Sequence, residues 1–383
     1  MSSLDSNAAY ARLKHAYENP LETALEKHRA GIPVAGCTSN TVPWELLRAG
    51  GFFPVLLQSH ATETPHADAY MEPVFSQRMR SLLEGLLSGT WSFLKILVIP
   101  RTSEQEHKLY LYVSEVIRQG AGSGVPEPYL YNLLHTRSAR SRAYGVAETL
   151  RLAARLAEIG GRKASQEDLL RAVNESNVAR GAIRRLLRLR RGKNLRLSGG
   201  EAVRAIGAWY FMDHGDYTAT VDALVPALSR RPPLEGPRIL IQGAPLDHPA
   251  LQEAIESEGA VVTAEDDWWN SRAAGRDIRS GSDPLQAIFE KYYRDAPSPR
   301  TFPHSAAERW FRAAALRDIE GVVFYLPPED DVLGWDYPRL RRWLEERGVP
   351  SLLVRDGARN LPEKARQWIA EFVSNLRRTR GNR

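Results

Sequence analysis

Short apolar runs of strand length alternate along this chain with segments whose apolar residues recur at helical spacing. Near the N-terminus, Ala9, Leu13, Ala16 and Tyr17 predict helix within residues 1–30. The next expected elements are a strand, a helix that opens at a proline, and two further strands, at residues 31–36, 43–51, 53–57 and 94–100. This succession is typical of a parallel α/β sheet.

The middle of the chain has a different pattern. Residues 128–230 lack strand-like runs and carry two helix start signals. Ser165 precedes Asp168 by three residues, and Ser198 precedes Glu201 by three, each ahead of apolar residues at helical spacing, which is the layout of a capping box. The proline-rich residues 231–237 predict a linker.

After that linker the α/β pattern restarts. Strands are expected at residues 238–243, 260–264, 321–326 and 351–354, and helices at 249–259, 337–348 and 362–378. The predicted fold class is therefore α/β, with two Rossmann- or flavodoxin-like parallel-sheet domains and a helical subdomain between them. The expected boundaries are 1–128 for the N-terminal α/β domain, 129–230 for the helical subdomain and 237–383 for the C-terminal α/β domain.

Composition narrows the class of protein. Of 383 residues, 43% are hydrophobic and 26% charged, which is typical of a globular chain with more than one core. No apolar run approaches the roughly 20 residues that a membrane-spanning helix needs. The N-terminus lacks the apolar stretch of a signal peptide, and one cysteine cannot form a disulfide within the chain. We therefore expect a cytoplasmic protein with no membrane partner.

A motif at residues 36–55 carries the strongest family signal. It begins Gly36-Cys37-Thr38-Ser39-Asn40-Thr41-Val42-Pro43-Trp44-Glu45-Leu46-Leu47 and ends Phe53-Pro54-Val55. This motif resembles the opening motif of the 2-hydroxyacyl-CoA dehydratase and benzoyl-CoA reductase subunit family. Later segments fit the same family in order and spacing, at residues 147–177, 239–247, 258–266, 319–324 and 344–353. The resemblance implies a place in acyl-CoA metabolism.

The resemblance also implies a cofactor that this chain is not equipped to hold. Subunits of the family typically bind a [4Fe-4S] cluster through three cysteines, and those positions correspond here to Ser39, Ser76 and Ser103. The one cysteine, Cys37, lies two residues before the first position. Clusters are held by soft, anionic thiolates, whereas a serine hydroxyl is a hard, neutral ligand. We expect no metal and no cofactor in this chain, with a [4Fe-4S] cluster on a partner subunit.

If the family fold holds, the three serines converge on one pocket. The further pocket candidates are Cys37, Glu45, Glu104 and His107, and Glu106 lies beside the last two. A hydroxyl-lined pocket of this kind can bind a ligand or support acid–base chemistry. The simpler alternatives are that residues 104–108 are a solvated helix start and that Cys37 is a small buried residue at a strand end. No catalytic residue is assigned.

Other motifs add little. The chain has no Walker A loop, no Gly-x-Gly-x-x-Gly after a strand, no His-Glu-x-x-His and no Gly-x-Ser-x-Gly. The acidic and histidine pairs within residues 214–217 and 266–269 are too few for a metal site.

Net charge is +6, concentrated in residues 180–193 and 377–383. The first run predicts an amphipathic helix with a solvated arginine face, and the alternative is an anionic partner such as the phosphates of coenzyme A. No zinc-finger, RNA-binding or helix-turn-helix pattern supports a nucleic-acid partner.

Three functions follow as hypotheses. The first is a cluster-less subunit of a heteromeric acyl-CoA dehydratase or reductase, paired with a homologous, cysteine-bearing subunit and contacting a CoA thioester. The second is an iron-free enzyme that uses the former cluster pocket, and the third is a non-catalytic, CoA-thioester-binding regulatory protein. The partner subunit would form a hetero- or homodimer with this chain. Whether this chain is itself an enzyme stays open at this point.

Overall fold

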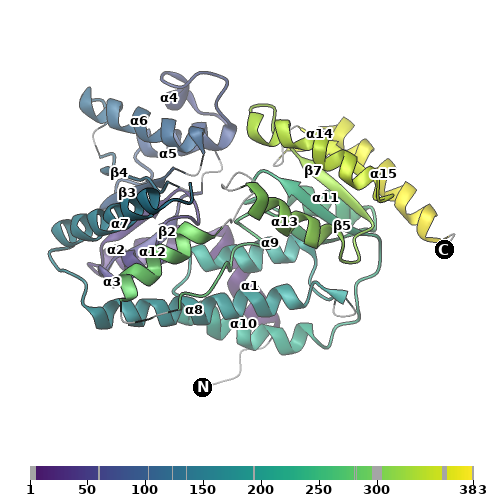
Figure 1. The fold of residues 1–383 in the computed structure, drawn as a ribbon, viewed down its shortest axis with the longest axis horizontal. Helices are drawn as coiled ribbons and strands as arrows, with labels where there is room; N and C mark the ends of the chain where they lie inside the picture. The colour runs from purple at the N-terminus through teal and green to yellow at the C-terminus, as the bar shows by residue number, and fades with distance from the viewer. Residues whose placement is uncertain are drawn as a thin grey trace.

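The computed structural model describes residues 6–381, apart from residues 59–60, 102, 123, 135, 193–194, 280, 282, 296–303 and 356–359. Within them the chain forms two four-stranded parallel sheets, each flanked by helices (Figure 1). The predicted α/β class with two parallel sheets is confirmed. The exact domain boundaries stay a prediction.

The first sheet belongs to the N-terminal third of the chain. Its strands are β1 (Val34–Cys37), β2 (Phe53–Leu56), β3 (Ile96–Pro100) and β4 (Pro128–Tyr131), in the spatial order β2-β1-β3-β4. Ala35 pairs with Pro54 on one side and with Ile96 on the other. Strands β1 to β3 are buried along their whole length, as expected for a parallel sheet covered on both faces.

The described residues of the N-terminal third also form six helices. They are α1 (Ser6–Glu18), α2 (Glu22–Arg29), α3 (Trp44–Ala49), α4 (Pro65–Asp68), α5 (Gln77–Leu87) and α6 (Glu104–Arg118).

The middle of the described chain is helical. It contains α7 (Ala139–Gly160), α8 (Gln166–Arg188), α9 (Gly199–Gly207), a 3-10 turn η2 (Ala208–Tyr210) and α10 (His214–Leu228). Both predicted capping boxes are present. The Ser165 hydroxyl accepts from the Asp168 backbone N–H at 3.1 Å while the Asp168 carboxylate accepts from the Ser165 N–H at 3.0 Å. Ser198 and Glu201 exchange the same two bonds, each at 3.1 Å.

The second sheet repeats the strand order of the first. Its strands are β5 (Arg238–Gly243), β6 (Val261–Asp266), β7 (Gly321–Tyr325) and β8 (Ser351–Val354), in the order β6-β5-β7-β8. Gly243 has a φ of 151°, and a Cβ there would lie 1.9 Å from the Tyr325 carbonyl oxygen, so only glycine fits. The helices of this half are α11 (Ala250–Ser257), α12 (Pro284–Arg294), α13 (His304–Ala315), α14 (Asp331–Glu345) and α15 (Glu363–Gly381).

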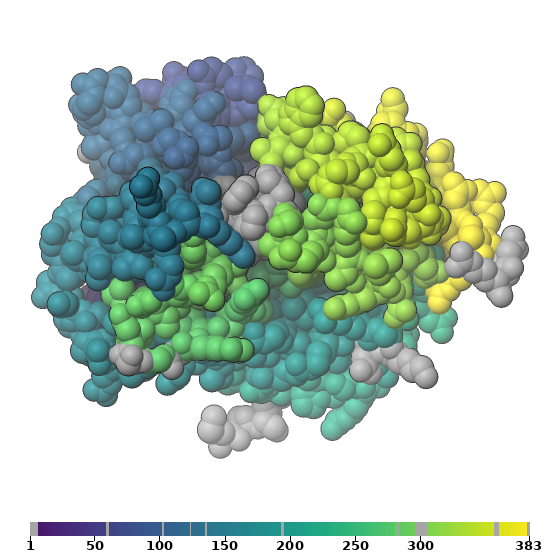
Figure 2. Space-filling model, in the orientation of Figure 1, coloured from purple at the N-terminus to yellow at the C-terminus, as the bar shows by residue number. Residues whose placement is uncertain are grey.

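Two hydrophobic cores underlie these sheets. One unites the first sheet with α7–α10 and with buried residues between 268 and 293, and the other lies within the second half. Helix α12 therefore leaves its own half and packs against α3, α7 and α8 (Figure 1). In the space-filling view the N-terminal lobe, purple to blue, and the C-terminal lobe, yellow-green, stand side by side (Figure 2).

Two expectations about elements were wrong. Residues 128–131, expected to lie in a span without strands, form β4, a four-residue edge strand that depends on pairing with β3. Helix α14 begins at Asp331 rather than at residue 337, because Asp330 caps it by accepting from the Leu333 N–H at 3.1 Å. Within the part of the chain that the structure describes, no helix combines the length and the apolar character to cross a membrane.

Candidate functional site

The shared strand order predicts where a ligand would bind. In each sheet the chain leaves the first strand toward one side and later returns to pair on the other, and open α/β sheets bind ligands at the carboxyl ends of the strands beside such a switch point. In this chain the loops that follow β1 and β3 occupy that position in the first sheet.

The carboxyl-end loops of the two sheets contact each other. After β1, the Asn40 amide donates to the Trp268 carbonyl at 3.4 Å and to the Ala273 carbonyl at 3.0 Å, both of them beyond β6. After β2, the Gln58 amide donates to the Asp247 carbonyl beyond β5 at 2.8 Å. The candidate site therefore lies where the two halves of the chain meet.

The three serines each begin or follow an element at this junction. Ser39 is 1% exposed in the loop after β1, and its hydroxyl lies 2.8 Å from that of Thr41. Ser76 is the N-cap of α5, and Ser103 is the N-cap of α6, where its hydroxyl accepts from the Glu106 N–H at 3.2 Å. In this structure, capping and loop bonds occupy the hydroxyls.

A buried carboxylate links these segments. The Thr38 hydroxyl donates to one Glu106 oxygen at 3.2 Å, and the Ser103 hydroxyl lies 3.5 Å from the other. Glu106 itself is 4% exposed. The Ser76 N–H donates to the Gln105 side chain at 3.2 Å. We call Thr38, Ser39, Ser76, Ser103 and Glu106 the serine site.

Arg78 of α5 contacts the serine site and the second half of the chain. Its guanidinium donates to the Thr38 carbonyl and lies 5.7 Å from the centre of the Trp268 ring.

The other predicted residues lie in different environments. The Glu104 side chain is 71% exposed, 3.4 Å from Arg101 and 3.9 Å from the half-buried His107. Glu104 therefore lies at a solvent-exposed helix start, as the simpler alternative for residues 104–108 predicts. Sequence reasoning singled out Glu104 and His107, but Glu106 is the residue that reaches the β1 loop. Glu106 could have been identified from the sequence because it lies three residues after the Ser103 cap, and a side chain at that position of a helix faces back toward the cap.

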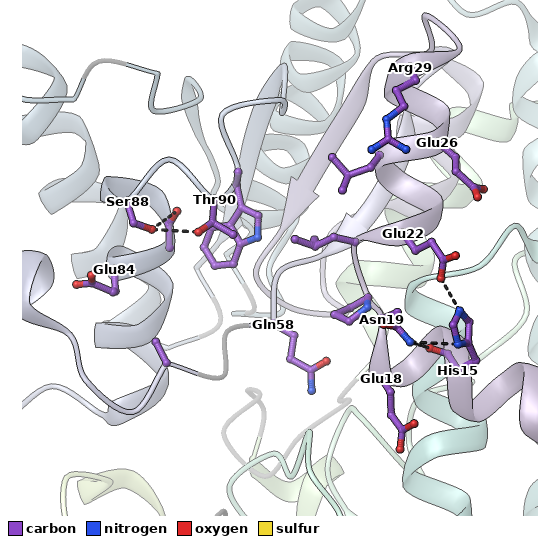
Figure 3. A pocket seen from close by; sticks show the side chains of 16 residues that line it. His15, Glu18, Asn19, Glu22, Glu26, Arg29, Gln58, Glu84, Ser88 and Thr90 are labelled. Atoms are coloured by element: carbon purple, nitrogen blue, oxygen red, sulfur yellow. Dashed lines mark hydrogen bonds and ion pairs between the residues drawn. The ribbon is translucent and has the colours of Figure 1, made fainter.

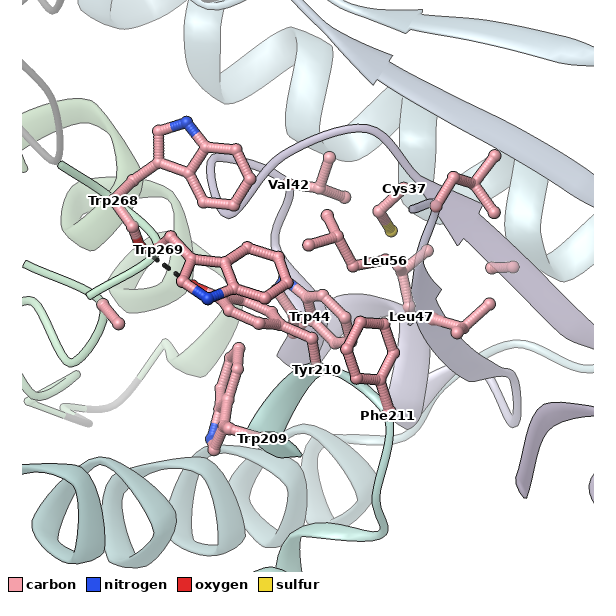
Figure 4. Close-up of a cluster of buried hydrophobic side chains, with 14 of the residues drawn as sticks. Cys37, Val42, Trp44, Leu47, Leu56, Trp209, Tyr210, Phe211, Trp268 and Trp269 are labelled. Carbon is pink, nitrogen blue, oxygen red and sulfur yellow. Dashed lines mark hydrogen bonds between the residues drawn. The ribbon is translucent and has the colours of Figure 1, made fainter. Parts of the chain in front are cut away.

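Cys37 lies inside the first sheet. It pairs with Leu56 and Val98, and it is fully buried among apolar side chains (Figure 4). Burial raises the pKa of its thiol far above the ordinary value. A protonated, enclosed thiol is a poor nucleophile and a poor metal ligand.

Glu45 is also buried, but it is paired. It forms an ion pair with Arg180 of α8, and the Tyr292 hydroxyl of α12 donates to it at 2.8 Å. Burial alone would raise the pKa of Glu45, yet the charges of Arg180 and Lys291 bring it below the ordinary value. Glu45 thus fastens α3 to α8 and α12 and does not reach the serine site through any of these bonds.

Two acidic residues lie at the carboxyl end of β6: Asp266 is its last residue and Asp267 follows it directly. The Asp267 carboxylate accepts from the N–H groups of Leu246 at 3.1 Å and Asn270 at 2.8 Å, and Asp266 pairs with Arg272 at 2.6 Å. Burial and the nearby Glu265 raise the pKa of Asp267 to about 7. Burial also raises the pKa of Asp266 to about 6, with Arg272 opposing the shift.

The arginine run is mostly paired, so the expected solvated face was wrong for much of it. Arg180 and Arg190 are each 1% exposed, and Arg190 binds Glu265 with two hydrogen bonds at 2.6 and 2.7 Å. Arg184 and Arg185 pair with Asp277 and Asp222, each at 2.5 Å. The run fastens α8 to the rest of the molecule.

A cavity of about 720 Å³ opens beside Gln58, between the α1–α2 turn and α5 (Figure 3). Its charged lining is mainly carboxylate: Glu18, Glu22, Glu26 and Glu84 face one arginine, Arg29. Because carboxylates repel phosphate, this cavity does not fit the phosphates of a CoA thioester.

The donor atoms present do not fit an iron–sulfur cluster. The three serine hydroxyls are hard ligands engaged in caps and loop bonds, and the one thiol lies within the sheet. Among the described residues, no group of three or more His, Cys, Asp or Glu side chains has the arrangement of a metal site.

Comparisons with known proteins place these features in context. A family model described as 2-hydroxyglutaryl-CoA dehydratase, D-component, matches residues 39–373. The (R)-phenyllactyl-CoA dehydratase beta subunit of Clostridium sporogenes is 22% identical over 97% of this chain and all of its own length. The beta subunit of (R)-2-hydroxyglutaryl-CoA dehydratase from Acidaminococcus fermentans is 21% identical over 87% of this chain and 89% of its own. A putative dehydratase subunit of Escherichia coli, YjiM, is 25% identical over 75% of this chain and 76% of its own.

Proposed function

Because this chain belongs to the 2-hydroxyglutaryl-CoA dehydratase D-component family, we propose that it is a dehydratase subunit that relies on a cysteine-bearing partner for iron–sulfur chemistry. The partner is a homologous subunit, and the two together act on a 2-hydroxyacyl-CoA thioester. In this proposal the present chain binds its partner and forms one wall of the acyl-CoA site.

One observation carries the proposal. The family match includes all three positions that the resemblance assigns to cluster ligands, yet each is a serine whose hydroxyl caps a helix or bonds within a loop. The two relatives with named substrates are beta subunits, which supports a multi-subunit assembly for this chain too.

The serine site would serve the assembly as a rigid wall. Glu106 ties the β1 loop to α6, and Asn40 ties the same loop to the second half of the chain. A loop bonded on both sides holds its shape when a substrate or partner packs against it.

The decisive experiment measures iron and acid-labile sulfide in chain purified without oxygen. We expect neither in stoichiometric amount from the chain alone. A stoichiometric cluster in the native sequence would overturn the proposal.

A gain of cluster binding tests the ligand positions directly. In the triple variant Ser39→Cys, Ser76→Cys and Ser103→Cys, we expect reconstitution to produce the visible absorption of a [4Fe-4S] cluster. The matched control moves each thiol by one residue, as Thr38→Cys, Gln77→Cys and Glu104→Cys, and is expected to bind no cluster. Equal iron in both variants would show that these three serines are not special.

A second candidate is an iron-free enzyme that uses the serine site, and the burial of Glu106 beside two hydroxyls favours it. It requires the purified chain alone to turn over a 2-hydroxyacyl-CoA thioester. It also requires Glu106→Gln to abolish turnover while Glu104→Gln preserves it. Turnover that survives alanine at Ser39, Ser76 and Ser103 would count against it.

A further inference from the structure

A second cavity, of about 380 Å³, lies at the opposite end of the second sheet from the serine site. Arg238, which begins β5, lines it, as do Asp318 and Ile319, which precede β7. The lining therefore comes from the amino-terminal edge of that sheet, together with the end of α8 and with α13. Its volume is in the range of small-molecule sites.

The cavity gathers four arginines against one lining carboxylate. They are Arg190, Arg191, Arg238 and Arg317, and the carboxylate is that of Asp318. Asp318 pairs with Arg238 at 3.2 Å. The side chains that line the cavity therefore carry a net positive charge.

Two of these guanidinium groups have no protein partner in the described part of the chain. Arg191 and Arg317 form no ion pair and no side-chain hydrogen bond with the described residues. The pKa of Arg191 is lowered, first by partial desolvation and then by the positive charges of Arg317 and Arg190, so both neighbours disfavour its charged form. A bound anion would relieve that repulsion.

A buried donor also remains unused. Arg190 is 99% buried, since 1% of its surface is exposed, and two of its nitrogens bind Glu265. Its Nε–H has no hydrogen-bond partner among the described residues. An unpaired buried donor is destabilising unless a ligand or a water accepts from it.

Most of the remaining wall is apolar, with Thr263 and Ser271 as its polar members. Leu187, Leu195, Ala313, Ala314 and Trp310 contribute to it, and at the rim Leu316 is 65% exposed. Such a wall suits a flat or aliphatic group attached to the anion.

We propose that this cavity binds a phosphate ester with a flat aromatic group, the chemistry of a nucleotide. Arg191 and Arg317 hold the phosphate, since guanidinium groups pair with phosphate oxygens through two parallel hydrogen bonds. The Arg190 Nε–H is closed off from solvent in this structure and becomes a further donor only when the side chain shifts, and the apolar part of the wall receives the base. This site is separate from the serine site and does not depend on the proposed function.

Titration calorimetry on the purified full chain tests the site, with ADP, inorganic phosphate, adenosine and CoA as probes. We expect ADP to bind more tightly than phosphate and adenosine not to bind detectably. CoA is included because its nucleotide end has the same chemistry as a free nucleotide. Tighter binding of CoA than of ADP assigns the cavity to the nucleotide end of CoA. Phosphate binding as tightly as ADP would overturn the role of the apolar wall.

Charge reversal locates the site. Arg191→Glu and Arg317→Glu are each expected to weaken ADP binding about tenfold or more. Arg188→Glu, an exposed arginine of α8 outside the cavity lining, is the matched control and should leave the affinity unchanged. If either reversal disturbs folding, as judged by circular dichroism, the neutral Arg191→Gln and Arg317→Gln replace it. Native affinity in these variants, no ADP binding by the parent chain, or tighter binding of a single-stranded oligonucleotide than of ADP would each refute the proposal.

Discussion

Single residues inside this molecule carry charges that other segments must neutralise, and Glu45 shows the consequence. Its carboxylate is fully buried and pairs with Arg180, so Arg180→Met would leave it without its nearest positive charge. We expect a loss of about 3–5 kcal/mol in the free energy of unfolding, measured in urea. Arg184→Met, which breaks the more exposed pair with Asp277, should cost less than about 1 kcal/mol. Similar losses in both variants would contradict this account.

The raised pKa of Asp267 predicts that the stability of the folded chain depends on pH. Its pKa is about 7 in the folded chain against an ordinary 3.8, so between these values the folded state holds a proton that the unfolded state has lost. Its contribution to stability is therefore complete below the lower pKa and is lost as the pH rises through about 7. We expect Asp267→Asn to flatten the fall in stability over this window, by up to about 1.4 kcal/mol per pH unit.

Urea midpoints of the parent chain and of Asp267→Asn, measured between pH 3.8 and about 7, check this prediction. The comparison uses the slope against pH, so it does not depend on the absolute stability of the variant. Asp266 remains and titrates in the same direction at about 6, so part of the slope should persist. Asp277→Asn, at a more exposed ion pair, should leave the slope of the parent chain intact. If stability falls with pH as steeply in Asp267→Asn as in the parent chain, the Asp267 carboxyl is not the source of the pH dependence.

Residue roles were predictable from the sequence only where the chemistry is local. The capping roles of Ser165 and Ser198 follow from spacing within one helix turn, and both are confirmed. Pairing across the molecule is not local. Nothing near Arg180 or Arg190 in sequence indicates that Glu45 and Glu265 neutralise them, so the arginine run was expected to face solvent.

At the scale of elements, the start of α9 depends on a carboxylate from another helix. Glu256 of α11 accepts from the N–H groups of Gly199 at 2.6 Å and Gly200 at 3.1 Å, and from that of Val262 in β6 at 3.2 Å. The Ser198 hydroxyl satisfies only one such group, that of Glu201. Glu256 therefore joins α9, α11 and β6.

Removing this carboxylate should therefore destabilise the chain more than removing the local cap. We expect Glu256→Ala to cost about 2–4 kcal/mol in urea unfolding, because it leaves three donors without an acceptor. Ser198→Ala should cost about 1 kcal/mol. Glu253→Ala, on the same helix in a half-exposed pair with Arg204, is the control and should change stability little. A smaller loss at Glu256 than at Ser198 would reverse the proposed order.

A helix or strand was predictable from the sequence when its own residues stabilise it, and less so when distant segments hold it in place. The apolar run of β5 and its flanking residues mark a strand whose observed bounds equal the expected ones. The sequence did not indicate β4 because three of its four residues are only partly buried and the strand is held in place by pairing with β3. The same dependence on distant partners explains why Glu106, and not Glu104, meets the β1 loop.

At the scale of the whole molecule, the two sheets were predictable but their connection was not. The resemblance and the repeated strand pattern indicate two α/β halves, which is the fold observed. The path of α12 back onto α3, α7 and α8 depends on shape and burial between segments far apart in sequence, such as Tyr292 and Glu45. The serine site inherits this geometry, because Asn40 reaches across the same junction.

This connection predicts how the chain unfolds. Among the described residues, nine that are buried in the first core come from the second half, including Trp269 and Tyr292. A fragment of residues 1–236 lacks all nine and leaves Glu45 without the Tyr292 hydroxyl, so we expect no cooperative unfolding transition from it by tryptophan fluorescence. Mixing it with residues 237–383 should restore a transition. The full chain with Tyr292→Phe, which loses one hydroxyl and keeps the ring, should still unfold cooperatively at a lower urea midpoint. A sharp transition in the isolated fragment would mean that the first core is complete without α12.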